Sequence, residues 1–239
     1  MQLWTIFAVI CAYIIKGLCG FANTLVLSTM LSFRTNNINI TPVELIVGYP
    51  SNIIMTWKER KSLNWKIWLP LVCLVIAGSI PGAVILKSGN VTVIKIIFGF
   101  VVAGIGIEMF FRERQRKKKE SSSALMLLIG LLSGLLCGLF GIGALLAAYV
   151  GRTTDNSKVF RGNLCIVLLA ENTFRLILYS VTGILTAEVC RSALLLIPFM
   201  ALGLLTGIGL SRVLDEKKIK SGVMIMLILS GLSLIVTNL

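Results

Sequence analysis

The sequence predicts an all-α integral membrane protein built as two inverted repeats, and three observations carry this prediction. The composition is 56% hydrophobic and only 14% charged, with a mean hydropathy of +0.93, which is far above the values of soluble proteins. Apolar stretches recur from one end of the 239-residue chain to the other, and similar glycine clusters occur near the start of each half. Such a chain has no separate soluble domain.

Eight apolar stretches are long enough to be considered as membrane segments, since a spanning helix needs about 20 residues. They cover residues 3–33, 42–57, 65–86, 91–111, 124–150, 162–181, 193–210 and 219–239. A basic linker at 112–123 separates the first four from the last four. We therefore expect one membrane repeat at 1–120 and a second at 121–239.

Glycine positions support this internal repeat. A shift of 121 residues places Gly17 on Gly138 and Gly20 on Gly141. A shift of about 125 aligns two Gly-xxx-Gly motifs, Gly78/Gly82 with Gly203/Gly207. Each match alone mainly indicates close helix packing, but their shared order indicates a repeat.

Both glycine clusters, 16–23 and 134–143, are expected to interrupt a helix. Glycine costs about 1 kcal/mol in a helix interior relative to alanine. In a membrane, non-helical backbone is tolerated only where protein covers it or where it lines a wet cavity. The two clusters are therefore predicted to form the walls of a substrate site, with helix packing alone as the alternative.

The distribution of Lys and Arg favours two hairpins. If all eight stretches cross the membrane, the two sides receive 11 and 10 of these residues. If each glycine cluster turns its stretch back, loops 58–66, 112–119, 152–161 and 212–220 share one side and hold 17 of the 23, while the other side keeps 4. Cytoplasmic loops are basic, so we predict six full spans and two re-entrant hairpins. This topology places both termini outside the cytoplasm. We expect the protein to lie in the cell membrane of a prokaryote.

Helices that begin at the two turns would direct free N–H groups at an anion. The backbone and side chains predicted to bind it belong to Gly17, Gly20, Phe21, Asn23, Gly138, Gly141 and Gly143. Three further polar positions, Asn52, Asn172 and Glu44, belong to equivalent helices of the two halves and are expected near the same cavity.

Three charged residues inside apolar stretches are further candidates, because an intramembrane charge marks function by default. Lys16 precedes the first break; snorkelling or a structural pair is its alternative role. Arg175 lies four residues after Glu171, the favourable order for an ion pair within one helix. Either this pair is structural, or Arg175 presents its planar fork to an oxyanion and Glu171 tunes it or carries a coupling proton.

Histidine is absent, which removes imidazole relays, and the six cysteines contain no Cys-x-x-Cys pair. No nucleophile–base pair or metal-ligand cluster is evident, so an integral-membrane enzyme is disfavoured and no catalytic residue, metal or cofactor is expected. The net charge of +13 fits basic cytoplasmic loops rather than nucleic acid. The expected partners are a small anionic substrate and the lipid bilayer, with a homodimer left open.

The paired openings Gly17-x-x-Gly20-Phe21 and 133–143, the four-plus-four layout and the central basic linker resemble the sulfite exporter TauE/SafE family of membrane permeases. The resemblance covers nearly the whole chain and implies transport of sulfite, sulfonates or related small anions. The sequence departs from the family pattern after both breaks: the first lacks a longer glycine run, and Ala144-Leu145 replaces a usual Gly-Pro.

The leading hypothesis is a secondary permease for a small oxyanion, sulfur-containing such as sulfite or an organosulfonate, working by alternating access. The alternative is a channel-like or regulatory membrane protein in which the glycines serve packing alone.

Overall fold

The computed structural model describes residues 3–32, 40–88, 123–141, 143–154 and 156–214, with separate positions at 96–107 and 221–236. The longer regular elements in these ranges are α-helices. In chain order they are α1 (Leu3–Cys19), α2 (Asn23–Ser32), α3 (Ile40–Lys58), α4 (Trp65–Ser88), α6 (Ser123–Phe140), α7 (Ala144–Thr153), α8 (Ser157–Val181) and α9 (Ala187–Leu210), with a short 3-10 turn η2 (Arg60–Ser62). Residues 112–122 of the predicted linker at 112–123, and most of the fourth and eighth apolar stretches, lie outside the described residues; Ser123 begins α6.

Three of these helices are long and apolar enough to cross a membrane: 65–82 within α4, Ser157–Val181 and Ala187–Leu210. Two shorter apolar helical stretches, Leu3–Cys19 and Leu127–Leu139, end at or next to the glycine clusters. The described part of the chain therefore confirms an all-helical membrane architecture at the level of helix type and hydropathy.

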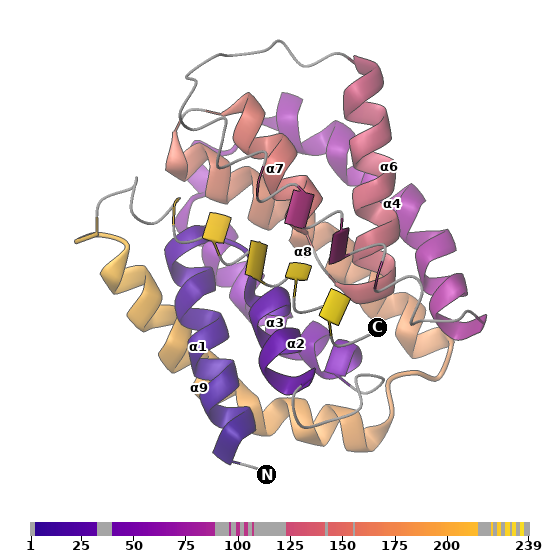
Figure 1. The fold of residues 1–239 in the computed structure, drawn as a ribbon, viewed down its shortest axis with the longest axis vertical. Coiled ribbons are helices and arrows are strands. Elements are labelled where there is room, and N and C mark those ends of the chain that lie inside the picture. Colours follow the sequence, from indigo (N-terminus) through magenta and orange to yellow (C-terminus); the bar gives the residue numbers. More distant parts are fainter. Residues whose placement is uncertain are drawn as a thin grey trace.

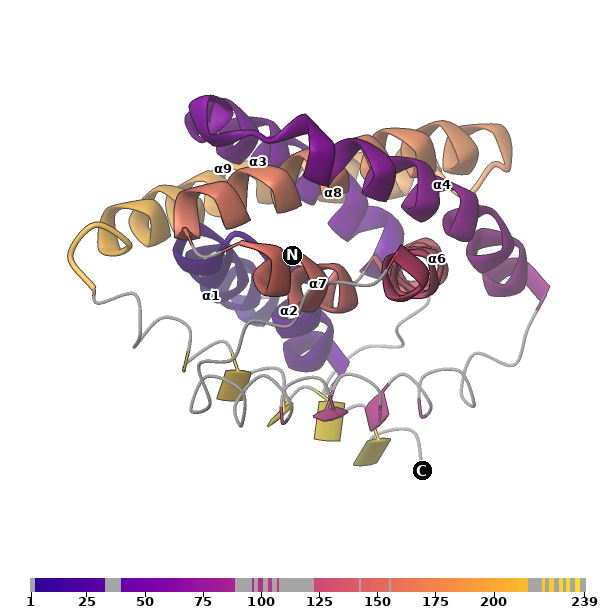
Figure 2. The ribbon, with the colours of Figure 1, turned by 90° about the horizontal axis from the view of Figure 1, so that it is seen from above.

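The helices form two layers. Figure 2 shows α9, α3, α8 and α4 on one side, with α1, α2, α7 and α6 beneath them. The layer that holds α1, α2, α6 and α7 contains both glycine clusters. In Figure 1, α1 lies along α9, and α4 lies along α6 at the opposite edge of the molecule.

Glycines bring these two outer helix pairs into backbone contact. A Cβ added at Gly207 of α9 would overlap the carbonyl of Ile14 in α1, and one added at Gly17 would meet the backbone of α9. In the other pair, a Cβ at Gly134 would overlap Val75 O in α4, and one at Gly78 would overlap Leu131 O in α6. Small residues permit this approach in membranes, where packing rather than hydrophobicity drives helix association.

Local signals define the ends of the central helix α8. The side chain of Asn156 accepts a hydrogen bond from the N–H of Lys158 at 2.8 Å and caps its start. Gly183, with a φ of 73°, follows its end. Thr186 then caps α9 by accepting from the N–H of Val189. The turn between α8 and α9 is therefore encoded locally.

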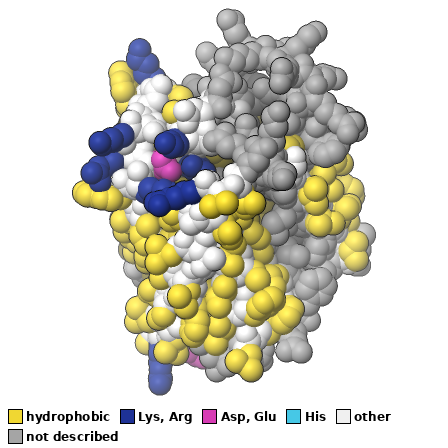
Figure 3. Space-filling model, turned by 90° about the vertical axis from the view of Figure 1, so that its left-hand side faces the viewer, with side chains coloured by type: hydrophobic (Ala, Val, Ile, Leu, Met, Phe, Trp, Pro, Cys, Tyr) yellow, Lys and Arg dark blue, Asp and Glu magenta, His cyan; other side chains and the backbone are white. Residues whose placement is uncertain are grey.

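The surface divides into an apolar belt and a basic end. Figure 3 shows apolar side chains over most of the described face, with most of the visible Lys and Arg gathered at one end. In this end, Glu59 Oε1 lies 3.6 Å from Arg161 Nη2 and 3.9 Å from Lys58 Nζ, and Lys158 and Arg212 are within electrostatic reach of Lys58. Leucines of α9 face outward, in keeping with contact to lipid; they are Leu194, Leu195, Leu202 and Leu205.

Candidate functional site

The first glycine cluster interrupts the helix where the sequence places the break. α1 ends at Cys19 and α2 begins at Asn23. Gly20 has a φ of 88° and Ala22 a φ of 73°. The second value is unusual, because the left-handed region costs an L-residue about 1–2 kcal/mol, and such strain persists where the surroundings determine it.

After this break the chain doubles back. Trp4, at the start of α1, donates from Nε1 to the carbonyl of Met30, near the end of α2, at 2.9 Å. The hydrogen bond joins residues 26 positions apart, so α2 returns along α1 rather than continuing its line.

The second cluster repeats the backbone arrangement of the first. α6 ends at Phe140, α7 begins at Ala144, and Gly141 has a φ of 71°. The N–H of Gly141 donates to Cys137 O at 2.8 Å, as the N–H of Gly20 does to Lys16 O at 2.7 Å. Ile142, which the shift of 121 residues places on Phe21, lies outside the described residues.

A small cavity lies between the two breaks. Its walls come from both halves of the chain: Phe21, Ala22, Asn23, Thr24 and Leu25 after the first break, Gly141 and Gly143 at the second, and Leu168 of α8. Its volume of about 20 Å³ admits roughly one water molecule. The structure thus brings together four of the predicted site residues, namely Phe21, Asn23, Gly141 and Gly143.

Glu44 of α3 interacts with the start of α2. Its Oε1 accepts from Asn23 Nδ2 at 2.6 Å and from Thr24 Oγ1 at 2.7 Å. The residue is 3% exposed. Glu44 thus faces two side-chain donors and the positive end of the α2 dipole.

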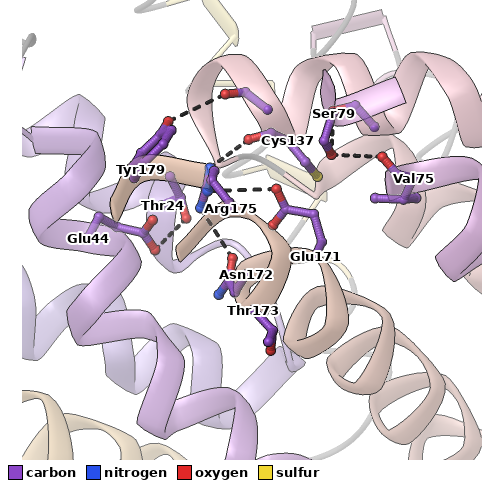
Figure 4. Close-up of polar contacts among 12 residues, drawn as sticks. Thr24, Glu44, Val75, Ser79, Cys137, Glu171, Asn172, Thr173, Arg175 and Tyr179 are labelled. Carbon is purple, nitrogen blue, oxygen red and sulfur yellow. Dashed lines mark hydrogen bonds and ion pairs between the residues drawn. The ribbon is translucent and has the colours of Figure 1, made fainter. Parts of the chain in front are cut away.

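Arg175 lies at the second break, at the end of α6. Its Nη1 donates to Cys137 O at 2.6 Å, and its Nη2 donates to Asn172 Oδ1 at 3.2 Å. A Cβ built on Gly141 would lie 2.8 Å from Arg175 Nη1 and 3.1 Å from Glu44 Oε2, so the cation and the carboxylate flank one glycine. Figure 4 shows Glu44 with Thr24 beside Arg175.

The predicted pair within α8 is formed. Arg175 Nε lies 3.7 Å from Glu171 Oε1, and each residue is 1% exposed. Neither of these two atoms has a hydrogen-bond partner among the described residues. The described residues therefore use the guanidinium fork only in part, which leaves donor capacity at the second break with respect to them.

Two other predicted residues are buried away from the cavity wall. Lys16 is 1% exposed, and its Nζ lies 5.7 Å from the ring centroid of Tyr13. No carboxylate of the described residues lies within ion-pair distance of it, although Glu44 attracts it electrostatically. Asn52 is also buried, and its Oδ1 has no partner among the described residues.

Gly17 and Gly138 lie at helix contacts. A Cβ at Gly17 would be 2.6 Å from Leu204 O in α9, and a Cβ at Gly138 would be 2.5 Å from Ser79 O in α4. At these two positions the structure gives a packing role, and neither lines the cavity.

Sequence reasoning did not single out Arg161 of α8. Its Nη1 donates to Leu18 O at 3.4 Å, near the end of α1, and its Cγ would lie 2.9 Å from a Cβ at Gly20. α8 thus places one arginine beside each break, Arg161 at the first and Arg175 at the second. The sequence signal that could have found Arg161 is that it lies on the same helix as Arg175. It was missed because its surrounding composition is that of a basic loop.

Among the described residues, no group of three or more Cys, Asp or Glu side chains is placed to hold a metal ion. The chemistry available at the cavity is hydrogen bonding and charge: backbone N–H groups, one amide, one hydroxyl, one carboxylate and one guanidinium. Such a set suits recognition of a small anion.

Comparison with known proteins agrees with this chemistry. The model of a family described as sulfite exporter TauE/SafE matches residues 5–234. No curated protein and no solved structure matches the chain. The family consists of membrane permeases, which fits the apolar helices and makes this chain an integral membrane protein. Since the match spans nearly the whole sequence, the chain belongs to the sulfite exporter TauE/SafE family.

Proposed function

We propose that the protein is a secondary permease that carries a small oxyanion, sulfur-containing such as sulfite or an organosulfonate, across the cell membrane of a prokaryote by alternating access. The observation that carries the proposal is the cavity lined by both helix breaks, with the Arg175 guanidinium beside it. Positive helix ends and a planar cation are the groups that recognise oxyanions.

Two glycine-mediated contacts support inverted repeats. The sequence pairs Gly17 with Gly138, and the motif of α4 with the motif of α9. In the structure α1 packs on α9 through Gly17, and α6 packs on α4 through Gly138. Each broken helix therefore packs on the glycine-motif helix of the other half, which is the arrangement expected of two exchanged, equivalent repeats.

Two basic loops lie together in the structure, which supports re-entrant hairpins. Eight simple spans would place loop 58–66 and loop 152–161 on opposite sides of the membrane. Glu59 and Arg161 instead form an ion pair at 3.6 Å, and Lys58, Lys158 and Arg212 gather around them. The hydrogen bond between Trp4 and Met30 is the further support for a hairpin in the first half.

The small volume of the cavity supports a moving carrier rather than an open pore. A site with room for about one water does not admit a four-atom oxyanion. Binding therefore requires the two breaks to separate, first toward one side of the membrane and then toward the other.

Flux into proteoliposomes tests this proposal. We expect saturable sulfite uptake that is accelerated by sulfite trapped inside, because a carrier returns faster when loaded. Non-saturable flux without counterflow would instead indicate the channel-like alternative. The observation that favours this alternative is the packing role of Gly17 and Gly138. The Gly183→Ala variant, altered in a turn where an added Cβ meets nothing within 4 Å, is the control for reconstitution.

Thiol labelling in a cysteine-free background tests the topology. We expect Ser157→Cys, at the start of α8, to react only from the cytoplasm, and Thr182→Cys, after its end, to react only from outside. Labelling of Ser157→Cys from outside alone would eliminate the two-hairpin arrangement.

A further inference from the structure

The Glu44 carboxyl group accepts hydrogen bonds from donors that an anion at the first break would need. The residue places a carboxylate on Asn23 and Thr24, the two polar side chains of the cavity wall, at 2.6 and 2.7 Å. These donors, with the positive end of α2, are the groups that a transported anion needs at the first break. In this structure an anion of the protein itself already holds them.

An incoming anion therefore encounters a negative charge at its own site. Glu44 Oε2 lies on the Gly141 side of the carboxylate, within reach of the space that Arg175 also faces. Two anions on shared donors repel, and in a buried site this repulsion is large. The conflict is resolved when Glu44 takes up a proton, since a neutral carboxyl no longer repels the anion and needs fewer donors.

We propose that Glu44 is an internal competitor of the transported anion: its carboxylate occupies the Asn23 and Thr24 donors in the empty carrier and releases them on protonation. This inference rests on the proposed transport function and adds the coupling ion. One anion and one proton bind together, and their departure lets the carboxylate return to the donors.

The charged and titratable groups that face Glu44 single it out for this role. They are Tyr13 and Lys16 of α1, Cys137 of α6, and Glu171, Arg175 and Tyr179 of α8. The start of α2 contributes only neutral donors, and α9 carries only Glu188, Cys190 and Arg191, all in its first two turns. Two other acids are buried among the described residues. Glu59 pairs with Arg161 at the basic end, and Glu171 pairs with Arg175 and accepts nothing from the cavity wall.

The test measures anion affinity against pH with methanesulfonate, whose charge is constant between pH 5 and 9, alongside sulfite. For the native protein we expect the affinity to fall by about tenfold per pH unit once Glu44 ionises, the slope of one linked proton. Glu44→Gln keeps an acceptor for Asn23 and Thr24 but carries no charge. Its affinity should be independent of pH and exceed that of the native protein at alkaline pH.

Glu171→Gln is the matched control, because it neutralises a buried carboxylate of α8 that does not touch the cavity wall. It should keep the native pH slope whatever its absolute affinity. A second measurement needs no variant: in weak buffer, methanesulfonate binding to the native protein should withdraw about one proton from solution per anion bound.

The outcomes separate the two proposals. A native affinity that does not change with pH, no proton uptake, or an unchanged slope in Glu44→Gln overturns the role of Glu44 and leaves anion transport standing. The absence of saturable binding of either anion to the native protein at any pH overturns the transport function itself, and the role of Glu44 with it.

Discussion

The two helix breaks have nearly the same backbone and different side chains. At each, a glycine with a φ of 71° or 88° follows a helix, and its N–H donates to the carbonyl four residues earlier. Asn23 and Thr24 follow the first break and carry polar groups. The corresponding positions after the second break are Ala144 and Leu145, which carry none.

This difference shows how a duplicated scaffold can divide the work of binding. The first break supplies neutral hydrogen-bond donors, held by the Glu44 carboxylate. The second supplies a full positive charge, through Arg175 on the neighbouring helix α8. An anion between the two breaks would thus meet a cation from one half and helix-end donors from the other. The predictions below test that division.

Loss of Arg175 should have the largest effect. Removing it alone leaves Glu171 as an unpaired buried charge, which costs about 3–5 kcal/mol, so we place Arg175→Ala in a Glu171→Gln background. Because its charge-assisted hydrogen bonds are lost, sulfite flux in proteoliposomes should fall by about 100-fold or more. The Glu171→Gln single variant is the control, and flux in the double variant equal to that control would remove Arg175 from the site.

Arg175→Lys sharpens the same point. Lysine keeps the charge but lacks the planar fork that reaches both Cys137 O and Asn172. In the same Glu171→Gln background, we expect the sulfite flux of Arg175→Lys to lie between that of the Glu171→Gln control and that of the Arg175→Ala double variant. Full activity of Arg175→Lys would mean that only the charge matters at the second break.

Gly141→Ala should lower transport strongly without unfolding the protein, but by less than the loss of Arg175. An alanine there pays about 1–2 kcal/mol for its positive φ, and its Cβ would lie 2.8 Å from Arg175 Nη1, so the guanidinium must leave its place. Gly183→Ala is the matched control, since its φ of 73° carries the same strain with no neighbour within 4 Å. Both variants should remain folded, with Gly141→Ala the less stable because the displaced guanidinium loses its contacts, and flux should be lowered strongly only in Gly141→Ala.

Thr24→Val should have an intermediate effect, confined to the first break. The change removes the hydroxyl at nearly constant volume and takes away one donor, which corresponds to about a tenfold loss of anion affinity. Thr24→Ser retains the hydroxyl and should bind like the native protein. Anion affinity can be read from ligand-dependent thermal shift; equal affinities in both variants would assign the anion to the second break alone.

Lys16→Gln should have the smallest effect. Lys16 is buried against the ring of Tyr13 and does not line the cavity, so it acts on the anion only through its field. We expect affinity to fall by a few-fold, and Lys16→Arg to retain it. Unchanged affinity in Lys16→Gln would leave Lys16 a packing residue.

The breaks themselves were predictable because glycine chemistry is local. Gly20 and Gly141 hold φ values that favour glycine, and clusters of glycine in apolar sequence mark such places. The pair Glu171–Arg175 was predictable for a similar reason, since residues four apart share a helix face. These features depend on neighbours within one turn of the chain.

The roles of Gly17 and Gly138 depend instead on which face of a helix meets its neighbour. Both lie within one turn of a break, and both turn toward another helix rather than toward the cavity. The contact of Glu44 with Asn23 and Thr24 joins positions 20 and 21 residues apart, across a loop whose path no spacing rule specifies. Arg161 was missed because composition assigns it to a loop, whereas the fold places it beside Gly20.

The glycine contacts of the outer helices bear on how the molecule deforms. Where backbone rests on backbone, as between Gly207 and Ile14 or between Gly134 and Val75, no side chain is available to rotate or compress. Each outer pair, α1 with α9 and α4 with α6, should therefore behave as a single stiff body. Sliding must then involve the central helices α3 and α8, which meet through side chains such as Tyr49 and Thr173, and these have rotamers to exchange.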